Sequence, residues 1–326
     1  MKLKDLGERE ILMLAKDICE DESGVHVGIG DDAAAMNIDG KSVVVSTDML
    51  VEKVHFGPDT SPEQVAKKAV VVNLSDLAAM GAEPLGMVFS IGAPRNKDLD
   101  FITRLLKGMN STAKHYGTQI VGGDLNESSQ VIVSGTAVGK AEPQKLLLRS
   151  EAKPGDFVGV TGTLGSSAAI TKAYLKNISL EDWPVLQKAS FEAAARVKEG
   201  RILSETEGVH SCIDITDGLA ANLWQISKMS EVGITVEWSE LPIKESVRRF
   251  AEEMDYDLED LVLYGGEDFE LLFTASEKAW ESLKTKFSEI KTKPSLIGKV
   301  EKEEGARIRK NKKIEKLPDR GYEHFS

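Results

Sequence analysis

Carboxylates beside small residues recur six times along this chain of 326 residues. The motifs are GIGDDA (28–33), STD (46–48), NLSD (73–76), GGD (122–124), DITDG (214–218) and GGED (265–268). Small residues let a backbone approach a ligand closely, and carboxylates are the ligands that Mg²⁺ takes when it bridges a protein to substrate phosphates. One such motif is more often a turn or a helix cap. Six together indicate a metal-assisted phosphate site.

The aspartates of these motifs need counter-charges if they converge. They lie near strand ends, helix starts or Gly-rich turns, where ligands bind in α/β proteins. Carboxylates a few Å apart repel one another and raise one another's pKa. Lys and Arg are scarce in the motifs, so divalent cations are the expected counter-charge. Oxygen ligands favour Mg²⁺ over Zn²⁺, which would take His or Cys.

Familiar nucleotide signatures are absent from the sequence. Gly40-Lys41-Ser42 matches the end of a P-loop, but residue 35 is Ala where the first Gly belongs. There is no H-R-D or D-F-G tract of a protein kinase, and GIGDDA is not G-x-G-x-x-G. VTGTLGSSAA (160–169) could hold a phosphate at a helix N-terminus, and a plain strand-to-helix turn explains it equally well. A nucleotide site would have to use another architecture.

Composition narrows the class of protein. Lys and Arg number 41 against 53 Asp and Glu, a net charge of −12, which argues against nucleic-acid binding through general basicity. The two cysteines, Cys19 and Cys212, cannot form a disulfide framework, and they favour a reducing compartment. No signal-peptide h-region and no window of about 18 apolar residues is present. We therefore expect a soluble, cytoplasmic protein without a membrane partner.

Periodicity predicts alternating helices and strands, hence a mixed α/β fold. A helix is expected to begin at Ser61 as N-cap and Pro62 as first residue and to run to Gly81. Other helices are expected at 5–18, 98–115, 187–200, 242–254 and 276–288, and from the aspartates of DITDG onward. Strands are expected at 41–48, 85–93, 118–124, 130–140, 233–237, 269–275 and 295–299, with a hairpin in the basic tract 307–316. The segment 156–175 is expected to form a strand, a Gly-rich turn and a helix.

A domain join is predicted between residues 141 and 156. This stretch carries two prolines, several charges and a terminal Pro-Gly. With the boundary near Ser150, the chain divides into domains 1–150 and 151–326, each of about the usual domain size.

Taken in order and spacing, the motifs resemble those of a known family. GIGDDAAAM, VSTDMLVEKVHF, NLSDLAAMGAEPLG, IVGGDLN, DITDGL and GGEDFELLF are similar to segments of bacterial and archaeal thiamine-monophosphate kinases, which belong to the aminoimidazole ribonucleotide synthetase superfamily. The resemblance runs from about Gly28 to the terminal GYEHF. It implies a two-domain aminoimidazole ribonucleotide synthetase-like fold whose N-terminal sheets form a barrel across a homodimer. It also implies transfer of the γ-phosphoryl group of ATP to thiamine monophosphate, giving thiamine diphosphate, with several Mg²⁺ ions.

The resemblance also implies roles for individual residues. Expected metal ligands are Asp32, Ser46, Thr47, Asp48, Asp76, Asp124, Asp214 and Asp217, with Asp31 behind them. Ser46 and Thr47 are expected to contribute through side-chain or main-chain oxygens. Expected ATP contacts are Tyr116, Gly123, Arg149 and Thr216, and expected contacts to thiamine monophosphate are His55, Glu267 and Tyr322. No residue is expected to act as general base, because the second pKa of a phosphate, near 6, leaves the attacking oxygen ionised at neutral pH.

Several of these residues have plainer interpretations. Alone, Arg149 is a solvated linker residue, Tyr116 packs at a strand edge, His55 is an ordinary surface or core histidine and Tyr322 packs on the body of the protein. Two other functions stay open at this point. One is another ATP-dependent enzyme of the same superfamily, such as an aminoimidazole ribonucleotide synthetase, and the other is a non-catalytic, metal-dependent nucleotide-binding protein.

Overall fold

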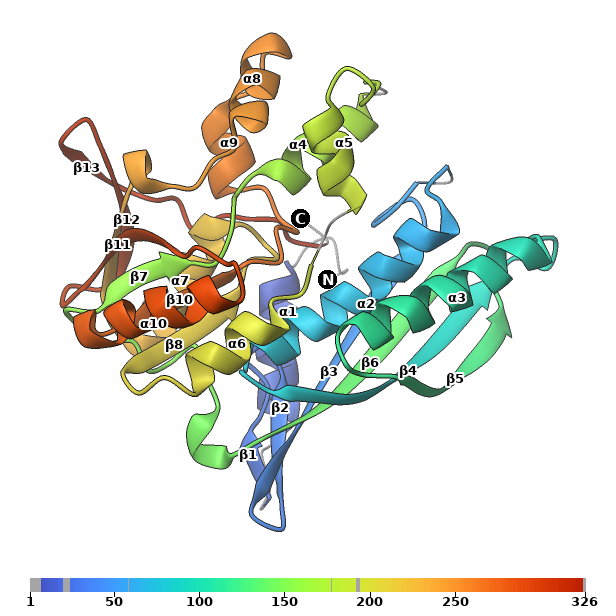
Figure 1. The fold of residues 1–326 in the computed structure, drawn as a ribbon, viewed down its shortest axis with the longest axis horizontal. Coiled ribbons are helices and arrows are strands. Elements are labelled where there is room, and N and C mark those ends of the chain that lie inside the picture. The colour runs from blue at the N-terminus through green and yellow to red at the C-terminus, as the bar shows by residue number, and fades with distance from the viewer. Residues whose placement is uncertain (1–6, 20–23, 58, 177, 192–193, 325–326) are drawn as a thin grey trace.

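Two β-sheets with helices packed on them form the framework of the molecule (Figure 1). The structure is a computed structural model that describes residues 7–19, 24–57, 59–176, 178–191 and 194–324. The first sheet has the order β1-β2-β3-β6-β4-β5 and the second β13-β12-β9-β11-β7-β10-β8. The sequence-based expectation of a mixed α/β fold is confirmed.

The strands of the first sheet are β1 Val25–Val27, β2 Ala34–Ile38, β3 Lys41–Val51, β4 Glu83–Ala93, β5 Ile120–Glu127 and β6 Ile132–Ala141. Those of the second are β7 Phe157–Val160, β8 Val209–Asp214, β9 Gly233–Glu237, β10 Leu271–Ala275, β11 Ser295–Glu301, β12 Gly305–Lys310 and β13 Lys313–Lys316. The α-helices are α1 Glu8–Ile18, α2 Pro62–Ala79, α3 Leu99–His115, α4 Ser166–Leu175, α5 Pro184–Phe191, α6 Val197–Ser204, α7 Leu219–Ser230, α8 Glu245–Glu253, α9 Leu258–Leu263 and α10 Glu277–Glu289.

Helices α2 and α3 cover one face of the first sheet and leave the other face open (Figure 1). Along β3 the side chains alternate between the two faces, as the pleat requires. Ser42, Val44, Ser46 and Leu50 are buried on the covered face, whereas Met49 is 53 % exposed on the open one. Asp48, which has the parity of Ser46, therefore points toward α2.

Helix α2 begins where the sequence predicts, because its first turn is capped on both sides. Ser61 Oγ accepts a hydrogen bond from Gln64 N, and Gln64 Oε1 accepts one from Ser61 N, while Pro62 takes the first helical position. Near its other end, Asn73 Oδ1 accepts a hydrogen bond from Asp48 N at 3.2 Å and Asn73 Nδ2 donates to Ala69 O. This asparagine fixes the helix to β3.

Helix α2 also packs against the second half of the chain. It contacts α6 and β8, and one hydrophobic cluster contains Leu74 and Met80 together with Cys212 and Phe273. The approach to α6 is close, because a Cβ added at Gly200 would lie 2.0 Å from Ala78 O. The two sheets thus share a core at this helix, and the division into residues 1–150 and 151–326 stays a prediction.

Most predicted elements are present, but strands β1, β2 and β8 were not predicted, and three further details differ. The helix predicted at 187–200 is two helices, α5 and α6. Just before α6, Ala195 N donates to the Tyr116 hydroxyl and Arg196 binds Glu270. Tertiary contacts override helical periodicity there. Helix α7 begins at Leu219 after Gly218, so the aspartates of DITDG do not cap it. Helix α9, of six residues, was too short to show a period.

The predicted hairpin in the basic tract is confirmed. Strands β12 and β13 pair antiparallel around Asn311 and Lys312, whose φ angles of 48° and 68° suit a tight hairpin turn. Within the described part of the chain, no helix is long and apolar enough to cross a membrane.

We predict that Gly200→Ala destabilises the protein by about 1–3 kcal/mol, because the added methyl group would push α6 away from the backbone of α2. Urea unfolding measures the change. Lys198→Ala, on the exposed side of the same helix, is the matched control and is expected to stay within about 0.5 kcal/mol of the wild type. Equal stability of the two variants would contradict a close contact between α6 and α2.

Candidate active site

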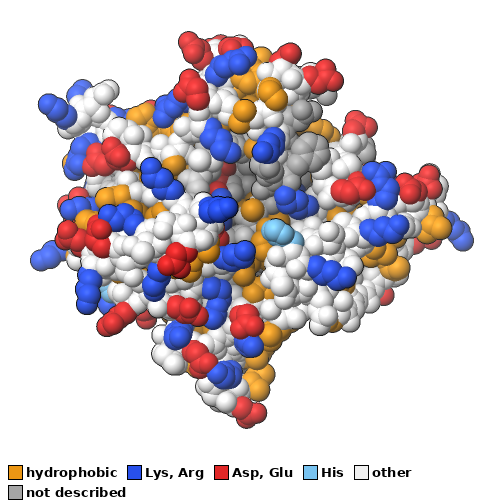
Figure 2. All heavy atoms as spheres, viewed as in Figure 1, with side chains coloured by type: hydrophobic (Ala, Val, Ile, Leu, Met, Phe, Trp, Pro, Cys, Tyr) orange, Lys and Arg blue, Asp and Glu red, His pale blue; other side chains and the backbone are white. Residues whose placement is uncertain are grey.

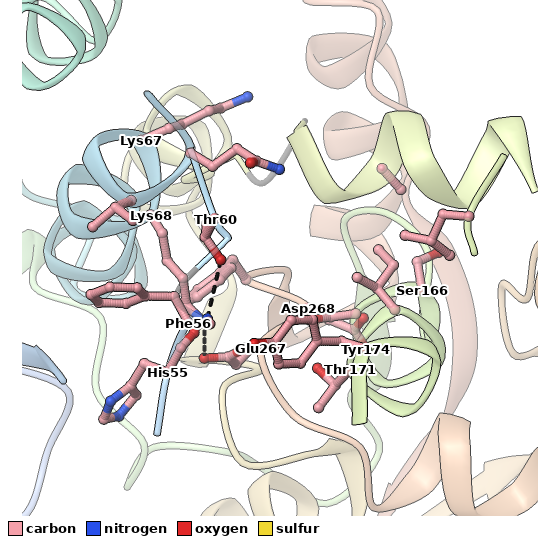
Figure 3. A pocket seen from close by; sticks show the side chains of 18 of the residues that line it. His55, Phe56, Thr60, Lys67, Lys68, Ser166, Thr171, Tyr174, Glu267 and Asp268 are labelled. Atoms are coloured by element: carbon pink, nitrogen blue, oxygen red, sulfur yellow. Dashed lines mark hydrogen bonds and ion pairs between the residues drawn. The ribbon is translucent and has the colours of Figure 1, made fainter. Parts of the chain in front are cut away.

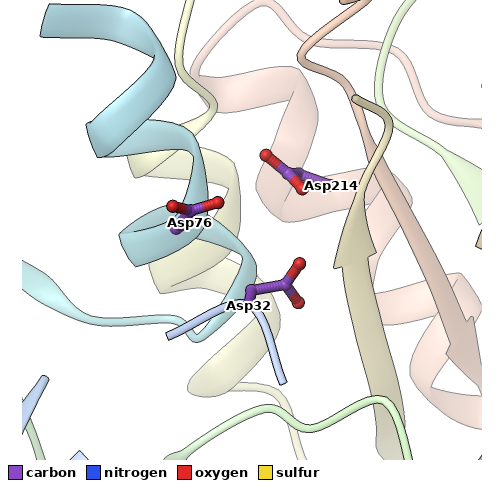
Figure 4. Close-up of side chains that lie close together, drawn as sticks. All are labelled: Asp32, Asp76 and Asp214. Atoms are coloured by element: carbon purple, nitrogen blue, oxygen red, sulfur yellow. The ribbon is translucent and has the colours of Figure 1, made fainter. Parts of the chain in front are cut away.

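Three carboxylates from distant parts of the chain face a common space (Figure 4). Asp32 lies in the turn between β1 and β2, Asp76 on the last turns of α2 and Asp214 at the end of β8. One oxygen of each lies within 4.8 Å of the others. The sequence predicted all three as metal ligands, and the fold brings them together.

These carboxylates are buried without enough positive charge. The side chain of Asp32 is fully buried, and Asp214 is 1 % exposed. Burial, together with the charges of the neighbouring aspartates, raises the pKa of Asp76 and of Asp214 well above the usual range. Among the described residues, Asp32 Oδ2 and Asp214 Oδ2 have no hydrogen-bond partner. The cluster thus offers two buried carboxylate oxygens that lack a partner, and all its possible ligand atoms are oxygens. Such a set of ligands fits a hard cation such as Mg²⁺.

Arg149, which lies outside the six acidic motifs, supplies a positive charge to the aspartate cluster. Its Nη2 donates to Asp32 Oδ1 at 2.6 Å and its Nη1 to Gln225 Oε1 at 2.6 Å. The interpretation of Arg149 as a solvated linker residue is therefore wrong, since its side chain is only 18 % exposed. Asp31 stands behind the cluster and accepts from Arg149 N, and burial raises its pKa to about 6. The expected contact of Arg149 with ATP stays a prediction.

Other expected ligands border the cluster. Ser46 Oγ donates a hydrogen bond to Asp76. Burial raises the pKa of Asp48, whose side chain is hydrogen-bonded to Asp76. Burial raises the pKa of Asp217 to about 6, and the charge of Glu8 adds to this shift. Ser46, Asp48 and Asp217 thus extend the site on either side of Asp76 and Asp214.

The side chains of two expected ligands point or lie away from the cluster within one chain. The Thr47 hydroxyl donates to Gly135 O at 2.8 Å on the open face of the sheet, so only a main-chain oxygen of Thr47 could serve as a ligand, which stays a prediction. Asp124 lies on β5, three strands from Asp48 or about 14 Å across the sheet. It is paired with Ser90, which is exposed on the open face, and it accepts a hydrogen bond from Asn126.

Tyr116 and Gly123 have structural roles in this chain. The Tyr116 hydroxyl accepts a hydrogen bond from Ala195 N at 2.9 Å, which is the packing role considered for this residue. A Cβ added at Gly123 would lie 2.1 Å from Phe89 O, so the pairing of β5 with β4 requires glycine there. Their contacts with ATP stay predictions.

A cavity of about 1010 Å³ opens between the start of α2 and α4 (Figure 3). His55 and Glu267, the expected substrate contacts, both line it. Lys68 from α2 lies between them, with its Nζ 2.6 Å from a Glu267 carboxylate oxygen and 2.8 Å from His55 O. Sequence reasoning missed Lys68. Figure 2 shows Lys and Arg side chains around the middle of this face, where they would attract an anionic ligand.

The turn that carries Glu267 is held to the DITDG turn. Glu267 N donates to Thr216 O at 2.8 Å and Phe269 N to Ile215 O at 3.0 Å. Both Glu267 and Phe269 have positive φ, 66° and 52°, a conformation that non-glycine residues adopt only when their surroundings impose it. The expected substrate contact and the expected ATP contact Thr216 are therefore joined through the main chain.

Asp268 is a second residue that the sequence did not single out. Its carboxylate accepts a hydrogen bond from Gly165 N at the start of α4, and burial raises its pKa to about 8. It fixes the Glu267 turn to the helix on the far wall of the cavity. The only signal in the sequence was its place inside GGED, where it was not separated from Glu267.

Tyr322 lies at the surface beside Asp217. Its N donates to Asp217 O at 2.9 Å, and its side chain is 51 % exposed. The interpretation of Tyr322 as a residue packed on the body of the protein therefore does not hold. Its contact with a substrate ring stays a prediction.

Comparisons with known proteins show which family the chain is similar to. The model of the AIR synthase related protein N-terminal domain matches residues 30–141, and that of the C-terminal domain matches residues 153–311. Curated relatives named thiamine-monophosphate kinase include that of Pyrococcus horikoshii, 39 % identical over 91 % of both chains. That of Bacillus subtilis is 36 % identical over 93 % of this chain and 94 % of its own.

Solved structures show the same architecture. The complex of AaThiL with AMPPCP and TMP superposes with a TM-score of 0.87 at 29 % identity and covers 99 % of both chains. The hydrogenase maturation protein HypE of Escherichia coli gives a TM-score of 0.70 at 22 % identity over 85 % of this chain and 86 % of its own, and this likeness concerns the fold alone.

We predict that the metal-free protein loses stability as the pH rises. The folded-state pKa values of Asp31 and Asp217, about 6, lie above their unfolded values near 4, so protonation favours the folded state. That contribution is full below pH 4 and is lost as the pH passes through 6. Between pH 5.5 and 7.5 the free energy of unfolding in EDTA should fall by about 1–2 kcal/mol. Excess Mg²⁺ should restore more stability at pH 7.5 than at pH 5.5, and an equal effect at both would contradict the assignment.

Asp76→Asn is predicted to stabilise the metal-free protein and to remove its response to Mg²⁺. Removing one carboxylate relieves repulsion in the cluster, so the free energy of unfolding of the metal-free variant should be about 1 kcal/mol higher than that of the metal-free wild type. The stabilisation of the variant by Mg²⁺ should disappear. Calorimetric melting with and without Mg²⁺ measures both effects. Asp98→Asn, at an exposed position that accepts no capping bond, is the control. Full Mg²⁺ stabilisation in Asp76→Asn would rule out the cluster as the cation site.

Proposed function

The chain belongs to the family of AIR synthase related proteins that contains the thiamine-monophosphate kinases, and on that premise we propose how its site carries out this reaction. The protein transfers a phosphoryl group from ATP to thiamine monophosphate and so makes thiamine diphosphate. The observation that carries the assignment is the convergence of Asp32, Asp76 and Asp214, together with a cavity lined by His55 and Glu267.

The reaction brings together two anions, the phosphate of thiamine monophosphate and the phosphates of ATP, and the site has to offset the repulsion between them. The acceptor is a phosphate whose attacking oxygen is already ionised near neutral pH. None of the described residues therefore has to remove a proton, and positioning and charge stabilisation carry the catalysis. We propose direct in-line transfer without a phosphoenzyme.

We propose that Asp32, Asp48, Asp76, Asp214 and Asp217 hold several Mg²⁺ ions, with Ser46 orienting Asp76. When bound, Mg²⁺ neutralises phosphate oxygens and aligns attacking and leaving oxygens. Arg149, now against Asp32, is placed to turn to an ATP phosphate once the aspartates have another counter-charge.

The cavity suits the other substrate. Glu267 offers a carboxylate to the cationic thiazolium ring, and Tyr322 and His55 offer ring faces. Because the Glu267 turn is hydrogen-bonded to Thr216, the thiamine side and the phosphate side keep a fixed separation. We also propose that the protein acts in the cytoplasm and that its two domains meet near Ser150.

We propose a homodimer in which the open faces of the first sheets meet as a barrel. Apolar residues gather on that face: Met36, Ile38, Met49, Leu85 and Val88 are all more than one-third exposed. An apolar patch of this extent is typical of an interface. Asp124 lies on the same face and far from Asp48, so it would reach a metal site through the second copy rather than through its own chain.

The activity is tested with ATP, Mg²⁺ and thiamine monophosphate. ADP and thiamine diphosphate should appear in equal amounts, and none should form in EDTA. A panel of other phosphate acceptors serves as the comparison. Binding of ATP with no product from any acceptor would instead favour a nucleotide-binding protein, and product from another acceptor only would favour another enzyme of the superfamily.

Subunit mixing tests whether Asp124 acts across the dimer. Asp76→Asn and Asp124→Asn should each be inactive alone, since each removes one ligand from every site. After unfolding and refolding together, half of the dimers carry one intact site of two, so about a quarter of wild-type activity should return. No recovery, although mixed dimers form, would show that Asp124 acts in its own chain or not at all.

A further inference from the structure

The first turn of α1 is hydrogen-bonded to the C-terminal segment of the chain. Arg9 Nη1 donates to Asp319 Oδ1 at 2.7 Å, and Arg9 N donates to Glu323 Oε1 at 3.1 Å. His324 N donates to Glu8 Oε2 at 3.2 Å. Gly7 packs so closely on Glu323 that an added Cβ would lie 2.3 Å from its carboxylate oxygen. The two ends of the chain thus form a clasp, here defined as residues 7–9 with residues 319–324.

This contact is unlike the docking of the other helices. Within the described residues α1 buries none of its side chains, and Leu12, Met13 and Ile18 are more than half exposed. The helix therefore adds little to the hydrophobic core, and its position depends on the polar contacts of its first turn. A helix held in this way is suited to positioning its partner segment.

The segment that α1 holds carries residues of the substrate side. Leu317 anchors it to the second sheet, because Leu317 N donates to Ala306 O and Leu317 O accepts from Trp224 Nε1. Beyond that anchor, Gly321 passes so close to Asp217 O that an added Cβ would lie 2.4 Å away. Tyr322 N donates to the same oxygen. The clasp therefore ends against the Asp217 turn.

Three rings follow one another from this segment toward the cavity. The ring centroids of Tyr322 and His324 are 5.0 Å apart in an edge-to-face arrangement, and those of His324 and His55 are 5.3 Å apart. His324 is thus the link between the two rings already proposed as substrate contacts. It stands inside the GYEHF segment, from which the sequence analysis selected only Tyr322.

We propose that the clasp is a positioning element of the substrate site, in which Glu8 and Arg9 hold the C-terminal segment so that His324 aligns the rings of Tyr322 and His55 for thiamine monophosphate. This inference rests on the proposed function of the cavity. His324 is a further residue of the substrate pocket, and Arg9 acts on the substrate only through the segment that it holds.

The test is a double-mutant cycle on Arg9 and Asp319, read as separate KM values for the two substrates. Arg9→Met and Asp319→Asn should each raise KM for thiamine monophosphate about two- to fivefold, which is the range expected for a partly exposed ion pair. The double variant should raise it no further than the larger single effect. KM for ATP should stay at its wild-type value. His324→Ala, which removes the linking ring, should raise KM for thiamine monophosphate about tenfold.

Asp17→Asn, at an exposed position on the same helix, is the control and should leave both KM values and the melting temperature unchanged. Variants that melt earlier with an unchanged KM for thiamine monophosphate would show that the clasp is only structural, and equal rises in both KM values would also overturn the proposal. An inactive wild type would overturn the proposed function itself, which distinguishes the two failures.

Discussion

The repulsion among buried carboxylates is the constraint around which this molecule is built. Asp32, Asp76 and Asp214 each have a carboxylate oxygen within 4.8 Å of the others, and Arg149 is ion-paired with Asp32. Such an arrangement costs folding free energy, because carboxylates out of water are stable only when they are paired, protonated or bound to a cation. The rest of the fold has to hold them in place against that cost.

Helix α2 does most of this work. It is buried along most of its length and packs on β3 and β6 of the first sheet. It also contacts helix α6 and strand β8 in the second half of the chain. Asp76 therefore sits where the two halves of the chain meet, opposite Asp214 at the end of β8 and Asp32 in an N-terminal turn. The substrate side depends on the same junction, because Lys68 of α2 reaches across to Glu267 of the second half.

The sequence predicted the elements and much of the site, and the misses have physical reasons. Asp32, Asp76 and Asp214 could be recognised because each belongs to a short motif that contains small residues and lies in a turn or near the end of an element. Family resemblance selected Arg149 as an ATP contact, which stays a prediction. Its pairing with Asp32 could not be foreseen, since it joins residues 117 positions apart. The Thr47 side chain points to the open face of the sheet because side chains alternate along a strand, and the STD motif alone does not show which face a residue takes. Lys68 and His324 gain their meaning only from neighbours brought near by folding.

The central claim is that the aspartate cluster is a cation site for phosphoryl transfer. A crystal structure grown with Mn²⁺ and a non-hydrolysable ATP analogue, with anomalous scattering recorded at the manganese edge, tests it most directly. Mn²⁺ takes oxygen ligands as Mg²⁺ does and can be located by its own signal. The account predicts manganese peaks bound by Asp32, Asp76 and Asp214, with Arg149 moved off Asp32. An ordered ATP analogue with no metal among these carboxylates would contradict it.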